Sequence, residues 1–149
     1  MRVFGMRTAG VLSFRSLKAW VLGCPLALRR KVCAGHLALI AVLSLVPAWL
    51  FPPSLAEVPG LDKWVHVAMY GVLGALFRWA AGVKAGPLGR WLPAAGAGYG
   101  FLMEFLQLWL GGGTRSFSWG DALANLAGVV LFWLLADRAM GRNGIMPSR

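Results

Sequence analysis

Four long apolar runs, separated by short stretches rich in proline, glycine or charge, dominate the pattern of this chain. They cover residues 32–51, 64–82, 91–111 and 119–136. Each run is long enough for a helix of about 20 residues, the length that crosses the hydrocarbon core of a bilayer. The pattern therefore predicts an all-α protein, an integral membrane bundle of four transmembrane helices.

Proline and glycine add detail to two of these runs. We expect the first helix to extend to Phe51, because Pro52 and Pro53 follow it and proline disfavours a helical conformation in the residue before it. The third run contains small residues that let neighbouring helices approach closely. These are Gly96, Gly98 and Gly100.

Lysine and arginine are distributed unevenly around the runs. They gather before the first run, between the second and third, and after the last, whereas only Lys63 and Arg115 lie in the other two connections. Basic residues are retained in short cytoplasmic loops. We therefore expect a multi-pass protein of the bacterial inner membrane, with both termini cytoplasmic and residues 52–63 and 112–118 facing outward.

Composition supports this interpretation. The chain has 149 residues, of which 58% are hydrophobic and 13% are charged, which is too apolar for an ordinary soluble domain. Its net charge of +10 comes largely from residues that flank the runs, so we expect no nucleic-acid partner. The expected organisation is a basic cytoplasmic or interfacial segment at 1–31, the four-helix domain at 32–138 and a basic cytoplasmic tail at 139–149. Within the first segment, residues 11–28 have the composition of an interfacial amphipathic helix.

The few acidic residues lie in or beside the apolar runs, where a charge is expensive. An ionised side chain at the middle of a bilayer costs roughly 2.5–3.5 kcal/mol on insertion scales, so such residues usually face a protein interior and mark a site. Asp62, Glu104 and Asp121 come within reach of His66 and Arg115 in the predicted topology. Glu104 is the strongest candidate, because it lies far from both ends of its helix and cannot cap one.

Polar residues and glycines recur at helical spacing in the last three runs, which places them on one face of each helix. The alternating directions of the helices bring these stripes to similar depths near the outer side of the membrane. We expect them to form a small polar pocket that opens outward. The stripes are Asp62, His66, Tyr70 and Gly74; Gly100, Glu104, Gln107 and Gly111; and Asp121, Asn125 and Gly128.

Three motifs occur in order along the chain: Asp62-Lys63-x-x-His66-x-x-x-Tyr70, Glu104-x-x-Gln107, and Arg115-Ser116 followed by Asp121-x-x-x-Asn125-x-x-Gly128. Together they resemble the VanZ-like family of membrane proteins, over about residues 35–136. This family takes its name from a protein associated with teicoplanin resistance. The resemblance implies a role in the cell envelope and brings no established reaction mechanism.

The leading hypothesis is a protein whose outward pocket binds or modifies a cell-envelope lipid headgroup or a peptidoglycan precursor, with an effect on glycopeptide susceptibility. Its expected partners are membrane lipids and a lipid-linked cell-wall precursor. The residues expected to bind this substrate are Asp62, Lys63, Tyr70, Gln107, Arg115, Ser116, Asp121 and Asn125.

Other functions remain open. An intramembrane hydrolase or transferase would use His66 and Glu104 as its catalytic acid–base pair. A proton-linked transporter could use the same residues to relay protons, and a structural membrane protein could use them to hold helices together. Metal binding by His66, Glu104 and Asp121 is conceivable, but no spacing fixes the ligand geometry, so we expect neither a metal nor another cofactor.

Two of the acids also have local explanations. Ser118 and Asp121 match the Ser-x-x-Asp capping box at the start of the last helix. Asp62 could cap the second helix and pair with Lys63 or Arg115.

Overall fold

A computed structural model describes residues 21, 23–50, 52, 58–82, 87–110, 113 and 116–141. This part of the chain is helical and contains no strand, so the all-α prediction is confirmed. The α-helices are α2 (Leu26–Leu45), α4 (Leu61–Ala81), α5 (Leu92–Leu110) and α6 (Trp119–Gly141), and the short 3-10 helices are η1 (Ala48–Leu50) and η2 (Pro87–Trp91).

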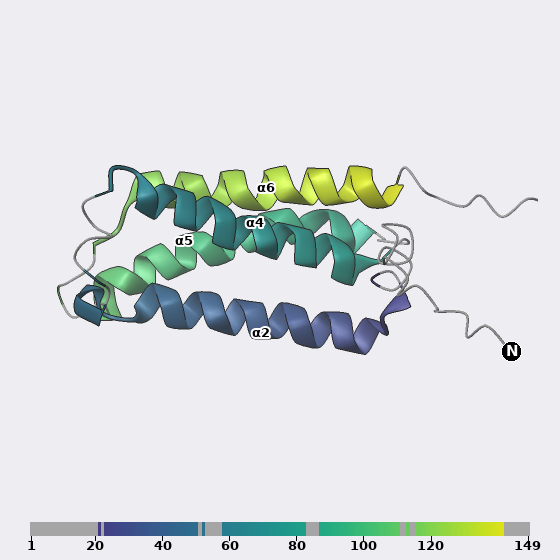
Figure 1. The fold of residues 1–149 in the computed structure, drawn as a ribbon, viewed down its shortest axis with the longest axis horizontal. Helices are drawn as coiled ribbons and strands as arrows, with labels where there is room; N and C mark the ends of the chain where they lie inside the picture. The colour runs from purple at the N-terminus through teal and green to yellow at the C-terminus, as the bar shows by residue number, and fades with distance from the viewer. Residues whose placement is uncertain are drawn as a thin grey trace, which may run out of the picture.

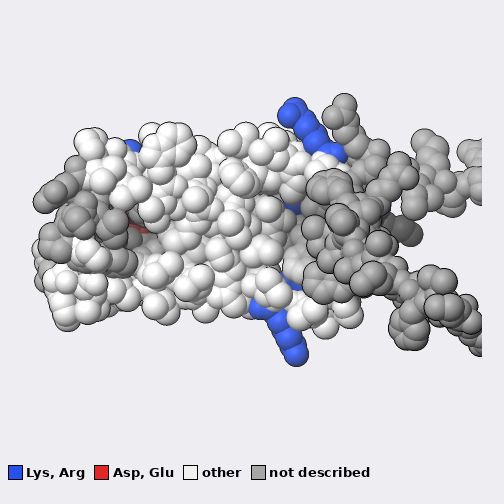
Figure 2. All heavy atoms as spheres, in the orientation of Figure 1, with Lys and Arg blue, Asp and Glu red and all other residues white. Residues whose placement is uncertain are grey.

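The four α-helices run alongside one another, and successive helices point in opposite directions (Figure 1). As a result, α2 and α5 begin at the end of the bundle where α4 and α6 finish. We call this the basic end, because Lys and Arg gather around it, and we call the opposite end the acidic end, because acidic atoms are visible toward it (Figure 2). The basic end includes Arg29, Arg30, Arg78, Arg90 and Arg138, and the acidic end includes Asp62, Lys63, His66, Glu104 and Asp121.

The most extensive helix contact joins α4 to α6, and glycines make it possible. A Cβ atom added to Gly128 would lie 2.5 Å from the carbonyl oxygen of Val67, and one added to Gly74 would collide with the carbonyl of Val129. Only glycine permits two helix backbones to approach this closely. The glycine stripes therefore do face their neighbours at these positions, whereas Gly98 in α5 has no such neighbour within 4 Å.

Side-chain hydrogen bonds to backbone carbonyls join α2 to the rest of the bundle. His36 Nε2 lies 2.9 Å from the carbonyl oxygen of Met69, and Tyr99 Oη donates to the carbonyl of Leu37 at 2.8 Å. These bonds connect α2 to α4 and to α5. Sequence reasoning missed His36, which lies on the apolar first run without a polar stripe around it.

The first helix differs from its predicted limits. It ends at Leu45 rather than at Phe51, because Pro47 interrupts the run and Val46 already has an extended backbone, with φ −60° and ψ 131°. The helix also begins earlier than expected, at Leu26, directly after Pro25. The predicted interfacial helix at 11–28 lies largely outside the described residues, and its last positions belong to α2.

Large apolar side chains cover the outside of the bundle, while several polar side chains lie inside. Glu104 and Asn125 are completely buried, as is Tyr70. Large exposed apolar surfaces mark contacts with a membrane or with another protein. By length and composition, α6 can cross a membrane over Trp119–Met140, and it is the one described helix that meets both criteria. Exposed apolar residues include Leu39, Val42, Val72, Phe101, Leu102, Leu108, Leu123, Leu131 and Leu135.

Candidate functional site

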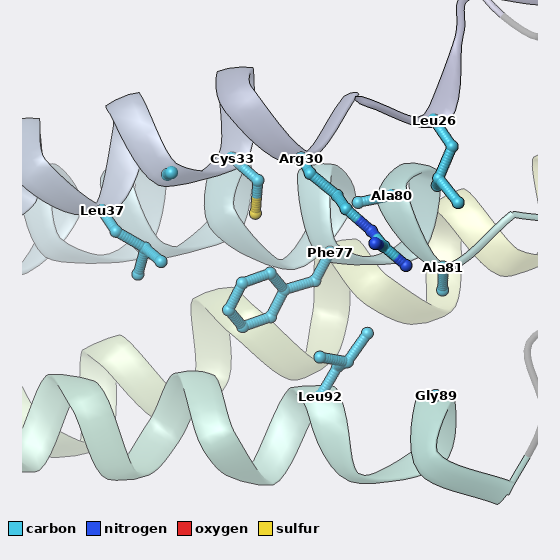
Figure 3. A pocket seen from close by; sticks show the side chains of 10 residues that line it. Leu26, Arg30, Cys33, Leu37, Phe77, Ala80, Ala81, Gly89 and Leu92 are labelled. Atoms are coloured by element: carbon cyan, nitrogen blue, oxygen red, sulfur yellow. The ribbon is translucent and has the colours of Figure 1, made fainter. Parts of the chain in front are cut away.

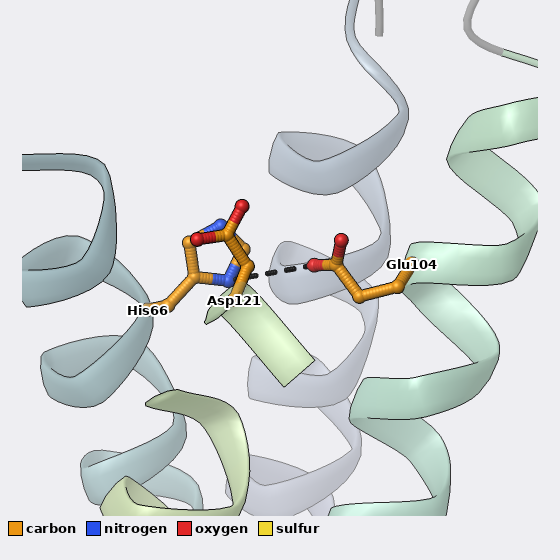
Figure 4. Close-up of side chains that lie close together, drawn as sticks. All are labelled: His66, Glu104 and Asp121. Atoms are coloured by element: carbon orange, nitrogen blue, oxygen red, sulfur yellow. Dashed lines mark ion pairs between the residues drawn. The ribbon is translucent and has the colours of Figure 1, made fainter. Parts of the chain in front are cut away.

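At the acidic end, three helices bring one ionisable side chain each to a common point (Figure 4). His66 belongs to α4, Glu104 to α5 and Asp121 to α6. One nitrogen or oxygen atom from each lies within 4.8 Å of the corresponding atoms of the other two. We call this group the His–Glu–Asp cluster. It is built from residues far apart in sequence, so its geometry depends on the packing of the whole bundle.

Glu104 is the most buried member of the cluster, with only 1% of its side chain exposed. Its Oε2 atom accepts a hydrogen bond from the backbone N–H of Ser118 at 3.4 Å. Its Oε1 atom has no hydrogen-bond partner and lies 3.7 Å from His66 Nδ1. A buried polar group without a partner costs about 1–3 kcal/mol, and more when it is charged. The protein therefore maintains an unfavourable arrangement at Glu104.

Asp121 combines a local role with a place in the cluster. Its backbone N–H donates to Ser118 Oγ at 3.2 Å, so Ser118 caps α6 as the capping-box motif predicts. In a complete capping box the Asp121 carboxylate would accept the N–H of Ser118, yet that N–H donates to Glu104. Asp121 Oδ1 is left without a hydrogen-bond partner and lies 3.6 Å from Lys63 Nζ.

His66 is held by neighbours on two sides. Its Nδ1 atom lies 2.9 Å from Oδ1 of Asn125, a hydrogen bond whose donor depends on the tautomer of the ring. Its ring is parallel to that of Tyr70, at an interplanar angle of 7° and a centroid distance of 6.5 Å. With 12% of its side chain exposed, His66 reaches the surface, whereas Glu104 does not.

The other polar residues around the cluster are also incompletely paired. Asn125 Nδ2, Gln107 Nε2 and Tyr70 Oη are buried and have no hydrogen-bond partner. Together with Glu104 Oε1 and Asp121 Oδ1, they make five such atoms on α4, α5 and α6. In a folded protein most buried polar groups are paired, so this concentration needs an explanation.

Of the other predicted binding residues, Asp62, Lys63 and Ser116 are exposed rather than buried with this group, although the Lys63 ammonium lies 3.6 Å from Asp121 Oδ1. Asp62 is exposed and forms a salt bridge with Lys63 at 2.9 Å, and the hydrogen bond from Lys63 lowers the pKa of Asp62. Asp62 does not cap α4, because Gly60 occupies that position without a side-chain hydrogen bond. The prediction that Asp62 could cap this helix is therefore wrong. Ser116 is exposed, and Arg115 lies outside the described residues.

A cavity of about 480 Å³ lies at the basic end rather than at the cluster (Figure 3). It lies between α2, α4 and the start of α5, and Arg30 projects into it from α2. Its lining is mainly apolar and includes none of the predicted site residues. An apolar space of this kind leaves no polar group unpaired, so the unpaired atoms at the acidic end indicate a site more directly than the cavity does.

Sequence reasoning also missed the partner of Arg78. The guanidinium of Arg78 is nearly buried, donates from Nε to Asp137 Oδ1 at 2.5 Å, and donates from Nη1 to the carbonyl oxygen of Gly82 at 2.8 Å. Arg78 and Asp137 are 59 positions apart, so no helical periodicity links them. The basic end thus contains a second buried charge, with its partners in place.

Comparisons with family models, with curated proteins and with solved structures gave no match. The chain is therefore characterised by its own geometry: an all-helical fold with an apolar exterior and a buried His–Glu–Asp cluster at one end.

Proposed function

We propose that this protein spans the bacterial inner membrane with four helices, and that its acidic end binds or modifies the polar headgroup of an envelope lipid or a peptidoglycan precursor. The apolar exterior supports the membrane location, because lipid is the solvent that such a surface requires. The resemblance of the three sequence motifs to those of VanZ-like proteins supports a role in the cell envelope.

The positions of the basic residues support the orientation. Described arginines of α2, α4, η2 and α6 lie at the basic end, which is the arrangement expected of a cytoplasmic side. In this orientation the acidic end meets the outer leaflet. A ligand there would come from the outer part of the membrane or from the cell wall.

The observation that carries the proposal is the group of unpaired polar atoms. Glu104 Oε1 and Asp121 Oδ1 can accept hydrogen bonds, Asn125 Nδ2 and Gln107 Nε2 can donate them, and Tyr70 Oη can do both. A headgroup with hydroxyl, amide or phosphate groups could pair with several of them. Binding would then relieve the free energy that these buried atoms cost in the unbound protein.

An intramembrane hydrolase or transferase is the second candidate, and the contact between His66 and Glu104 favours it. At 3.7 Å, Glu104 Oε1 is close enough to orient the imidazole or to stabilise its protonated form. A proton-linked transporter has less support, because the paired Arg78 occupies the basic end and no described acidic side chain connects it to the cluster. A purely structural role would leave the unpaired atoms unexplained.

Native mass spectrometry of the full chain purified in detergent tests the proposal. The wild type is expected to retain a defined envelope lipid or precursor, and Glu104→Gln is expected to lose it. Glutamine keeps the size of the side chain and an oxygen that can accept the Ser118 N–H, so the variant changes mainly the charge.

Asp137→Asn is the matched control, because it also removes one carboxylate but lies at the basic end and keeps an acceptor for Arg78. It should retain the ligand. Equal retention by all three proteins, or an empty wild type, would contradict the binding site. Conversion of the retained lipid by the wild type but not by His66→Gln would favour the enzyme, and loss of glycopeptide tolerance in Glu104→Gln cells at unchanged protein level would connect the site to resistance.

A further inference from the structure

The geometry of the His–Glu–Asp cluster points to a binding site for a divalent transition-metal ion of the Zn²⁺ class, and we propose that His66, Glu104 and Asp121 are its protein ligands. The inference rests on the proposed function, because the ion would lie within the same polar site. The metal ion would be the group with which that site binds a phosphate-bearing headgroup.

The distances suit a metal with modest rearrangement. Zinc bonds of roughly 2.0–2.2 Å to nitrogen and oxygen place tetrahedral ligand atoms about 3.3–3.6 Å apart. His66 Nδ1 and Glu104 Oε1 are already 3.7 Å apart, and all three ligand atoms lie within 4.8 Å of one another. Rotation of the Asp121 side chain at the start of α6 could supply the remaining movement, since this carboxylate retains 16% exposure.

An independent observation comes from the two carboxylates. Glu104 Oε1 and Asp121 Oδ1 are both buried without a hydrogen-bond partner, and the Glu104 side chain is 99% enclosed by protein. Two carboxylates side by side repel each other. Among the described Lys and Arg side chains, Lys63 pairs with this cluster, its ammonium lying 3.6 Å from Asp121 Oδ1. A divalent cation would neutralise both carboxylates and give each unpaired oxygen a ligand bond.

Neighbouring residues are placed as outer supports for such ligands. The N–H of Ser118 holds the second oxygen of Glu104, and Asn125 holds the ring of His66. Hydrogen bonds of this kind orient metal ligands in proteins and raise metal affinity. Asn125 supports His66 in this way if Nε2 coordinates the ion. If Nδ1, the atom that lies 3.7 Å from Glu104 Oε1, coordinates it instead, the metal bond replaces the bond to Asn125 and Ser118 is the remaining support.

Three protein ligands leave a coordination position open, as in catalytic zinc sites. This matters for the proposed ligand, because two carboxylates alone would repel an anionic phosphate. A bound divalent cation reverses that electrostatic preference and offers a phosphate oxygen a direct bond. The metal therefore explains how an acidic site could accept an anionic headgroup.

The test uses the full-length protein in detergent, stripped with a chelator and then titrated with ZnCl₂ by isothermal calorimetry. We expect one Zn²⁺ per chain, with affinity reduced at least about 10-fold in Asp121→Asn and in Glu104→Gln, since loss of a ligand should weaken binding at least as much as loss of an outer support. Substitution with Co²⁺ should give the visible spectrum of a four- or five-coordinate nitrogen–oxygen site, which both variants lose.

Asp137→Asn controls for a general loss of negative charge and should bind like the wild type. Asp121 lies at a half-buried helix start, so Asp121→Asn keeps the test valid if Glu104→Gln does not fold. Absence of saturable Zn²⁺ binding by the wild type, or equal affinity in all variants, would overturn the metal site. If Zn²⁺ does not bind but the protein still retains its lipid after chelation, the metal site is contradicted and the headgroup site is supported. If Zn²⁺ binds specifically to a protein that retains no lipid, the metal site is supported and the proposed function is contradicted.

Discussion

Arg78 at the basic end and Glu104 at the acidic end are both ionisable and both enclosed by the bundle. Arg78 has hydrogen-bond acceptors on α6 and at the end of its own helix, and none of its atoms is buried without a partner in the described structure. Glu104 has one weak backbone donor for Oε2, and its Oε1 has no hydrogen-bond donor, only a contact of 3.7 Å with His66 Nδ1. The two ends thus bury charge under very different conditions.

This difference in hydrogen bonding distinguishes a buried charge that stabilises the fold from a buried charge that serves a function. A paired buried charge holds its neighbours in place, and its removal destabilises the fold because a partner is left behind. A buried charge without a hydrogen-bond partner lowers the stability of the fold. Its presence in the protein is better explained by a ligand that it binds. Variants at the two ends should therefore change stability in opposite directions.

The largest loss of stability is expected for Arg78→Met. The substitution removes the hydrogen bonds to Asp137 and to the Gly82 carbonyl, and it leaves these acceptors without their donor. We expect the free energy of unfolding in detergent to fall by about 2–3 kcal/mol, in line with hydrogen bonds to charged groups. Thermal unfolding followed by circular dichroism, together with denaturant titration, measures the change.

Arg138→Met provides the control for Arg78, because it removes the same charge from an exposed position on α6. Its effect should stay within about 0.5 kcal/mol. If both variants lose the same stability, the burial of Arg78 has no special consequence and the comparison between the two ends fails.

An intermediate effect is expected for Gly100→Ala, which tests the packing around the cluster. A Cβ atom at this position would lie 2.9 Å from Asn125 Cβ and 3.0 Å from the Tyr70 ring, so α5 must move away from α4 and α6. Overpacking should reduce stability by about 1–2 kcal/mol and weaken ligand or Zn²⁺ binding. The measurement is the free energy of unfolding alongside a Zn²⁺ titration.

Gly98→Ala on the same helix is the matched control. Nothing lies within 4 Å of its Cβ position, so it should gain up to about 1 kcal/mol from helix propensity and leave binding unchanged. A loss at Gly98 as large as that at Gly100 would show that α5 tolerates no alanine, whatever its neighbours.

In this protein, sequence patterns predict which segments are helical more accurately than they predict where each helix begins and ends or which residues it contacts. Apolar runs locate the four α-helices of the described part of the chain, and the stripes correctly bring Glu104, Gln107 and Asn125 to buried positions. The limits of α2 depend on Pro47, a single residue whose effect is local and was outweighed by the long apolar run around it. Hydrophobic periodicity reports which face is buried and says little about where a helix ends.

Contacts between distant residues explain what the sequence could not predict. Whether Glu104 is paired depends on the direction of the Ser118 N–H, and the partner of Arg78 depends on how α4 and α6 align. The cavity is lined by residues of α2, α4, η2 and the start of α5, which are far apart in sequence. None of these has a spacing signature, because each arises from tertiary packing.

The smallest change in stability, and the one of opposite sign, is expected for Glu104→Gln. The variant replaces a carboxylate that has an unpaired buried oxygen with a neutral amide, and the amide can still accept the Ser118 N–H. We expect the free energy of unfolding to stay constant or to rise by about 1 kcal/mol, because the desolvation of a charge is no longer required. Denaturant titration of the ligand-depleted, chelator-treated protein measures this change without a contribution from bound ligand. A loss comparable to that of Arg78→Met would mean that Glu104 is held as firmly as Arg78, and its unpaired oxygen would then no longer indicate a binding site.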